Sequence, residues 1–187
     1  MISCGASFGP GQAVAERLVG LEIPSVPVIE SSLSLRLDLA MLARAHPLVL
    51  YVFPGCGGAL EGEKRAAVMD DVQHRAFRDL RPDIEAHGFT AMGVSGQAEQ
   101  QQREAGYANG LAHRLLCDPE LGLARALALP TFSWDGADWY QRLALIANEG
   151  RIVKAFYPIV SAWNSAAQVL AWLVLHDRVL DGGDDVG

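Results

Sequence analysis

The chain has 187 residues, which is long enough for one domain with a full hydrophobic core and short for two. Half of the residues are hydrophobic and a fifth are charged, so the composition is that of a folded globular protein and excludes disordered, collagen-like and coiled-coil classes. The net charge of -7, from 22 acidic and 15 basic residues, would be repelled by a phosphate backbone, so we expect no nucleic-acid partner.

The targeting signals sought in the sequence and the cysteine content both favour a location in the cytoplasm. No apolar run approaches the roughly 20 residues that a membrane span needs, and the N-terminus lacks the pattern of an export signal. We therefore expect a cytoplasmic protein without a membrane partner. Three widely spaced cysteines (Cys4, Cys56 and Cys117) favour free thiols over a disulfide framework. The five histidines show no metal-ligand spacing, so we expect no metal and no cofactor.

The first half of the chain contains the clearest strand. Periodicity predicts a short helix at 12–21, an extended segment at 23–29, its hairpin partner at 34–37 and one or two helical turns at 38–44. The six apolar residues at 48–53, ended by Pro54-Gly55, are typical of a buried parallel strand in the centre of a sheet. A loop at 55–68 and a helix from Asp70 or Asp71 to about residue 87 follow, and Pro82 is expected to kink that helix near Arg78.

The second half alternates strands and helices. We expect a strand at 89–95, a helix at 97–109, a short strand at 114–117 and a helix at 120–129. Strands at 141–148 and 151–157 form a hairpin, and a helix at 162–180 follows. This order predicts an α/β thioredoxin-like fold, with a central mixed β-sheet flanked by helices. We expect a single domain at 1–180, made of an N-terminal extension (1–46) and a core (47–180), and a flexible tail at 181–187.

From residue 48 onward, seven short segments stand in the order found in one family. They are Leu48-Val-Leu-Tyr-Val-Phe-Pro54, Phe77-Arg78-Asp79, Met92-Gly-Val-Ser95, Leu115-Leu-Cys-Asp118-Pro119, Arg142-Leu-Ala-Leu-Ile146, Gly150-Arg-Ile-Val153 and Val169-Leu-Ala-Trp-Leu173. The chain thereby resembles the peroxiredoxins, in their AhpC/TSA-like, bacterioferritin-comigratory branch. The resemblance implies a thioredoxin fold of the peroxiredoxin type, a peroxide substrate, a thiol reductant and a homodimer. In this family a cysteine thiolate attacks the peroxide O–O bond with the help of an arginine.

The sequence departs from the family pattern at the cysteine positions. The pattern places the peroxidatic cysteine seven residues before Phe77, where Asp70 stands, and the resolving cysteine at Arg75. Read by itself, Asp70 is a helix N-cap, a role that Asp fills well. A catalytic carboxylate is the other interpretation of Asp70.

Cys56 is the candidate replacement for the missing cysteine. It stands in Pro54-Gly55-Cys56-Gly57-Gly58, after the central strand, where open α/β sheets place their sites, and Pro54, Gly55 and Gly57 would line a substrate pocket. One interpretation is a nucleophile that forms a sulfenic acid with peroxide, to be reduced by an external thiol. The other is an inert, buried side chain. Either Cys4 or Cys117 could resolve a sulfenic acid, although we expect both to be free thiols.

The resemblance also identifies Arg142, which begins the strand that carries the active-site arginine in the family. Its guanidinium could bind a peroxide oxygen or another anion, or it could pair with Asp70 and make the pocket structural. Thr131 and the aromatic residues after it line a pocket rim or belong to the core. We predict an atypical peroxiredoxin-like thiol oxidoreductase that uses Cys56 with Arg142. The alternative is a non-redox protein of the same fold, acting as a binding or regulatory module or recruited to other small-molecule chemistry.

Overall fold

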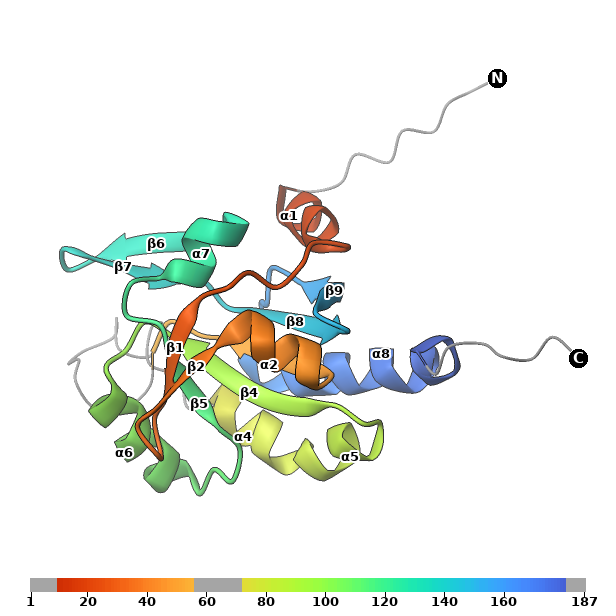
Figure 1. The fold of residues 1–187 in the computed structure, drawn as a ribbon, viewed down its shortest axis with the longest axis horizontal. Helices are drawn as coiled ribbons and strands as arrows, with labels where there is room; N and C mark the ends of the chain where they lie inside the picture. Colours follow the sequence, from red (N-terminus) through yellow and green to blue (C-terminus); the bar gives the residue numbers. More distant parts are fainter. Residues whose placement is uncertain (1–9, 56–71, 181–187) are drawn as a thin grey trace, which may run out of the picture.

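A seven-stranded mixed sheet forms the centre of the protein (Figure 1). The computed structural model describes residues 10–55 and 72–180. The strand order is β2-β1-β5-β4-β3-β8-β9. Its strands are β1 (Pro27–Glu30), β2 (Leu35–Asp38), β3 (Leu48–Val52), β4 (Thr90–Ser95), β5 (Leu115–Cys117), β8 (Leu143–Asn148) and β9 (Arg151–Phe156). Because β3, β4 and β5 are parallel while β1 and β8 pair antiparallel with their neighbours, the predicted mixed sheet is confirmed.

Helices cover both faces of the sheet, as expected for an α/β sandwich. One face packs against α1 (Pro10–Leu18), α2 (Leu39–Ala45) and α7 (Gly122–Leu127). The other face packs against α4 (Val72–Asp79), α5 (Arg81–Ala86), α6 (Glu99–Asn109) and α8 (Ser165–Leu180), with a short 3-10 turn, η1 (Ala162–Asn164), before α8. None of the helices in the described part of the chain is long and apolar enough to cross a membrane.

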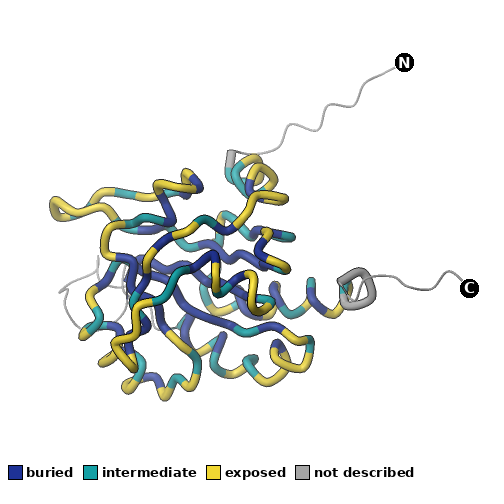
Figure 2. The backbone as a smooth tube through the Cα atoms, in the orientation of Figure 1, coloured by how far each residue is buried: buried dark blue, intermediate teal, exposed yellow. Residues whose placement is uncertain are grey.

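The predicted central strand is confirmed in β3, whose five residues are all fully buried. Alternate side chains enter the two cores: Leu48, Leu50 and Val52 face α2 and α7, whereas Val49 and Tyr51 face α4 and α8. Both faces of β3 are covered, so its sequence shows no polar alternation. Figure 2 shows the resulting buried band through the middle of the molecule.

The helix predicted at 70–87 is divided in two. α4 ends at Asp79 and α5 begins at Arg81, with Pro82 in the first turn of α5. Proline has no N–H to donate to the carbonyl four residues earlier, and its ring clashes there, so a new helix begins instead of a kink. Gly88, with φ of +80°, follows α5 as the predicted stop. Residues Asp70 and Asp71, where the helix was expected to start, lie outside the described residues.

A second, two-stranded sheet was not predicted. It consists of β6 (Thr131–Trp134) and β7 (Ala137–Tyr140). Asp135 and Gly136 join the strands with φ values of 50° and 76°, the conformation of a tight hairpin turn with two left-handed residues. The Asp-Gly pair between alternating residues was a signal for this hairpin in the sequence. The helix expected at 120–129 is α7, which spans Gly122–Leu127, and the hairpin follows it.

Candidate functional site

The carboxyl end of β3 is the centre of the candidate site. Pro54 and Gly55 follow Phe53, the first residue after β3, and both are buried. The backbone N–H of Phe53 donates to the carbonyl of Val94 at 3.0 Å, and the Ser95 hydroxyl donates to the carbonyl of Pro54 at 3.1 Å. The segment that leaves β3 is therefore fixed to the end of β4. Cys56, Gly57 and Asp70, with Cys4, lie outside the described residues.

Arg142 lies beside this strand end. Val52 pairs with Leu143 in antiparallel register, which places Arg142, one residue earlier, next to Phe53. Side chains alternate along β8, so Arg142 belongs to the same face as Ala144 and Ile146, which pack against the α4 and α8 side of the sheet. The strand register therefore places the backbone of Arg142 near the segment formed by Phe53, Pro54 and Gly55.

A buried polar cluster stands on the same face and was not predicted. The hydroxyl of Tyr51 lies 2.9 Å from Nδ1 of His74 and 2.6 Å from Nε2 of His113. His74 is 0% exposed in the first turns of α4. The Tyr51 ring stacks on Phe77 with centroids 4.3 Å apart, and the His74 ring meets Phe53 edge to face at 4.4 Å.

No sequence signal could have assembled this cluster. Its members come from β3, from α4 and from the loop before β5, and 62 residues separate Tyr51 from His113. The residue types had no characteristic spacing, and only the sheet register and the docking of α4 bring them together. A buried Gln73 adjoins the cluster, and both atoms of its amide have no hydrogen-bond partner within the described ranges.

The electrostatics of the cluster favour neutral imidazoles. Burial, followed by the nearby charges of His113 and Arg142, lowers the pKa of His74 to about 3. Burial, together with the Arg81 guanidinium, lowers the pKa of His113 to about 4. Because a cation is disfavoured here while Arg142 retains its charge, the site is suited to stabilise one small anion rather than to hold further positive charge.

The other sequence candidates lie elsewhere. Cys117 ends β5 and is 1% exposed, and burial, with the carboxylates of Glu99 and Glu30, raises the pKa of its thiol to about 12. β4 separates β5 from β3, so Cys117 lies two strand spacings, about 10 Å, from the β3 backbone. Arg75 is exposed on α4.

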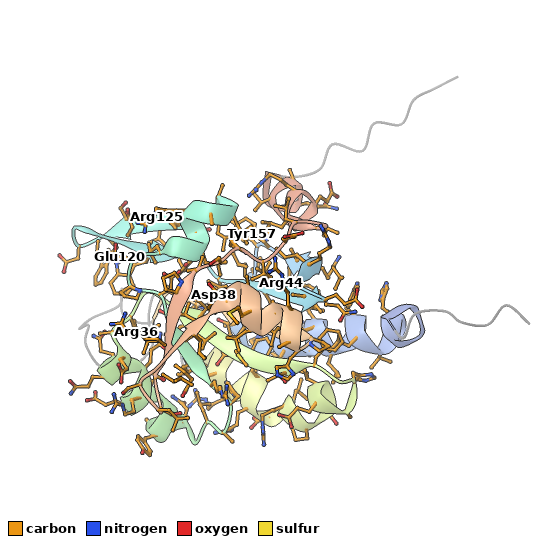
Figure 3. All side chains as sticks on the ribbon, viewed as in Figure 1. Arg36, Asp38, Arg44, Glu120, Arg125 and Tyr157 are labelled. Atoms are coloured by element: carbon orange, nitrogen blue, oxygen red, sulfur yellow. The ribbon has the colours of Figure 1, made fainter. Side chains whose placement is uncertain are left out.

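Thr131 is exposed at the start of β6, where it helps to line a surface hollow of about 450 Å³. The charged residues of that hollow include Glu120, just before α7, and Arg125, on α7 (Figure 3). The Thr131 carbonyl accepts a hydrogen bond from the amide of Gln141, the residue before Arg142, at 3.3 Å.

Within residues 10–55 and 72–180, no group of three His, Cys, Asp or Glu side chains is placed to hold a metal ion. What the arrangement offers chemically is a guanidinium, two neutral imidazoles and a phenol around the end of a parallel strand.

Comparison with known proteins supports the fold. No family model matches the sequence, and no curated protein matches it. Among solved structures, peroxidoxin BcpB from Mycobacterium tuberculosis is 15% identical with a TM-score of 0.69, covering 84% of this chain and 96% of its own. A reduced peroxiredoxin from Vibrio vulnificus in complex with hydrogen peroxide is 20% identical with a TM-score of 0.70, covering 84% and 96%.

A third similar structure is the bacterioferritin comigratory protein of Xanthomonas campestris, whose alkyl peroxide reduction activity has been studied structurally. It is 23% identical with a TM-score of 0.67, covering 84% of this chain and 98% of its own. The neighbours confirm the predicted thioredoxin-like fold of the peroxiredoxin type.

Proposed function

We propose that this chain, which has the fold of the peroxiredoxins, is an atypical thiol peroxidase that reduces hydrogen peroxide or organic hydroperoxides with Cys56 as its nucleophile. The observation that supports the proposal most is the position of Arg142. The strand register places Arg142 beside Phe53, and Phe53 is three residues before Cys56, so at most about 11 Å of chain separates Cys56 from the backbone position next to Arg142.

The proposed reaction needs only this thiol and this cation. The Cys56 thiolate attacks one peroxide oxygen, an S–O bond forms, the O–O bond breaks, and its electron pair leaves on the other oxygen. The sulfur is oxidised to a sulfenic acid while the peroxide is reduced to water or an alcohol. Arg142 stabilises the thiolate and the negative leaving oxygen, which is worth most in a site shielded from water.

A thiol reductant completes the cycle. An external thiol attacks the sulfenic sulfur and releases water as a mixed disulfide forms, and a second thiol then restores Cys56 and leaves as a disulfide. We propose an external reductant because Cys117 is buried, has a raised pKa and lies two strands from β3. No cofactor is required, since the peroxide is the oxidant.

Stopped-flow oxidation tests the proposal. We expect hydrogen peroxide and an alkyl hydroperoxide to add one oxygen to Cys56, seen by mass spectrometry, and we expect Cys56→Ser to abolish the reaction. Arg142→Gln should lower the second-order rate constant by about 100-fold, because the leaving oxygen loses its cation. The matched control is Arg151→Gln, which removes an exposed arginine from the neighbouring strand β9.

A second function is favoured by the residues at the two family cysteine positions. Asp70 and the exposed Arg75 occupy them, and a non-redox protein that binds small molecules through Arg142 would need neither thiol. Equal and slow oxidation of the wild type and Cys56→Ser would overturn the peroxidase proposal in favour of this one.

A further inference from the structure

The surface made by η1 and α8 lacks charged residues. Between Lys154 and Asp177 the chain has no Asp, Glu, Lys or Arg, although 20% of all residues are charged. The inward side of α8 explains part of this, because Ala166, Val169 and Leu173 are fully buried against the sheet. The outward side of a surface helix normally carries charged and polar residues, and the core gives no reason for their absence here.

The outward side of η1 and α8 is apolar instead. Trp163 is 68% exposed, Val174 57% and Leu175 77%. Ala167 and Ala171, which are also exposed, lie between them at helical spacings of three and four residues. Residues at these spacings share one side of a helix. We call these five residues the outer α8 face.

The outer α8 face is large for a patch that is left in water. Val160, which is 93% exposed just before η1, adjoins it in the chain. The exposed parts of Val160, Trp163, Val174 and Leu175 amount to on the order of 500 Å². The largest apolar patches on soluble monomers are of this size and frequently serve binding. A symmetric pair would bury twice as much, on the order of 1,000 Å², which is the size at which specific protein interfaces begin.

Charge favours a second copy of this chain as the partner. Helices that lie on a lipid surface carry Lys and Arg along their polar side, and the stretch between Lys154 and Asp177 has none. With a net charge of -7, two copies repel each other over most of their surfaces. The outer α8 face is neutral, so two copies that meet there place no like charges in contact.

The order of large and small residues along the face fits an antiparallel pair. A two-fold axis at Ala171 places Ala167 of one copy against Leu175 of the other, and Gln168 against Val174. A large side chain then lies over a small one on both sides of the axis. A parallel pair would place Leu175 against Leu175 and Ala167 against Ala167, which leaves a gap at the alanines.

We propose that the outer α8 face is the interface of a homodimer in which two α8 helices pack antiparallel about a two-fold axis at Ala171. The short alanine side chains at the axis let the helix axes approach to about 8 Å. Leu175 of each copy fills the space over Ala167 of the other. This association involves no thiol chemistry, so it stands or falls independently of the proposed peroxidase function.

Sedimentation velocity of the full-length protein, from about 1 to 100 µM, tests the interface. We expect a dimer at the upper concentrations. Ala171→Glu should raise the dissociation constant by at least about 100-fold, because two carboxylates then meet at the axis. The matched control is Ala13→Glu, which changes an exposed alanine of α1, on the other side of the sheet, and should leave the dimer unchanged.

A charge rescue tests the antiparallel register. Ala167→Glu and Leu175→Lys should each weaken the dimer, whereas the double variant should recover at least tenfold of the lost affinity, because each new carboxylate faces the new ammonium of the other copy. Within one helix the two positions are two turns apart, too far to pair with each other. A variant that merely folds badly would not be rescued by a second charged residue.

Two results would overturn the homodimer: a wild type that stays monomeric at 100 µM, or a dimer that Ala171→Glu and Ala13→Glu affect equally. A monomeric wild type that sediments with phosphatidylcholine vesicles would assign the outer α8 face to lipid instead. A double variant as weak as the single ones would overturn the antiparallel arrangement.

Discussion

Cys117 illustrates how the surroundings of a single residue set its chemistry. Cys117 is the last residue of β5, where it pairs with Ile29 of β1 on one side and with Ser95 of β4 on the other. Burial raises the pKa of the thiol to about 12, and the nearby carboxylates of Glu99 and Glu30 act in the same direction. Since the thiolate is the reactive form, this cysteine is nearly inert at neutral pH.

We therefore predict that Cys117 resists alkylation in the folded protein. Iodoacetamide at pH 8 should leave the Cys117 peptide unmodified in native protein and modify it fully once the protein is unfolded in urea, as measured by mass spectrometry. The unfolded sample is the control for the chemistry of the peptide itself. Rapid labelling of Cys117 in the native state would contradict the pKa shift.

Some residues of the candidate site could be predicted from the sequence, and others could not. Pro54 and Gly55 were identified because they follow a strong apolar strand, and strand patterns survive without tertiary information. Arg142 was identified only through the resemblance to the peroxiredoxins. Tyr51 and His74 were missed because Tyr51 reads as one more apolar strand residue, and nothing in the chain indicates that a histidine of α4 packs onto it.

Among the secondary-structure elements, the strands and the longer helices were predictable within a few residues. The errors occurred where local chemistry outweighed periodicity: Pro82 starts a new helix, and the Asp135-Gly136 turn makes a hairpin. In both cases, one or two residues determine the backbone conformation. A hydrophobic pattern read over a longer window does not register the effect of such single residues.

Helix α7 is held in place by hydrogen bonds to the side chain of Asp118. This carboxylate accepts hydrogen bonds from the backbone N–H groups of Gly122 and Leu123 at 2.8 and 2.9 Å, and from the hydroxyl of Tyr140 at 2.6 Å. It thereby joins the end of β5 to the start of α7 and to β7. Three donors, two of them from a helix with only six residues, rely on one side chain.

We predict that Asp118→Ala lowers the free energy of unfolding by about 3 kcal/mol, because it removes the helix cap and leaves a buried hydroxyl without its acceptor. Urea unfolding followed by circular dichroism measures the change. Asp138→Ala is the control, since among the described residues that carboxylate accepts a hydrogen bond from Ser133 alone, at 2.5 Å, on the exposed hairpin. Equal destabilisation by both variants would argue against the role of Asp118.

On the scale of the whole molecule, the sheet separates two cores with different polarity. Apart from Asp118 and the Tyr140 hydroxyl, which hydrogen-bond to each other, the core under α2 and α7 is apolar, whereas the core under α4 and α8 contains Gln73, His74 and the Tyr51 hydroxyl close to Arg142. Buried polar groups cost free energy that an apolar core would not incur. Their concentration on one face, next to the end of β3, fits a site that uses them.

The neutral histidines of that core make the stability of the whole protein depend on pH. The folded-state pKa values of His74 and His113 are lowered to about 3 and about 4, from 6.5 for an ordinary histidine. Between these values and pH 6.5, the unfolded chain binds more protons than the folded one. The stabilising contribution is therefore fully present above pH 6.5 and is lost as the pH falls toward 4.

We predict that the free energy of unfolding, measured by urea denaturation at pH 7, 6, 5 and 4.5, falls with a slope of up to about 1.4 kcal/mol per pH unit for each histidine. His113→Gln should flatten this slope, because one of the two titrating groups is gone. The exposed His46→Gln should leave the slope unchanged. If all three proteins lose stability in parallel, carboxylates alone explain the acid sensitivity, and the imidazoles of the polar core are not held neutral by burial.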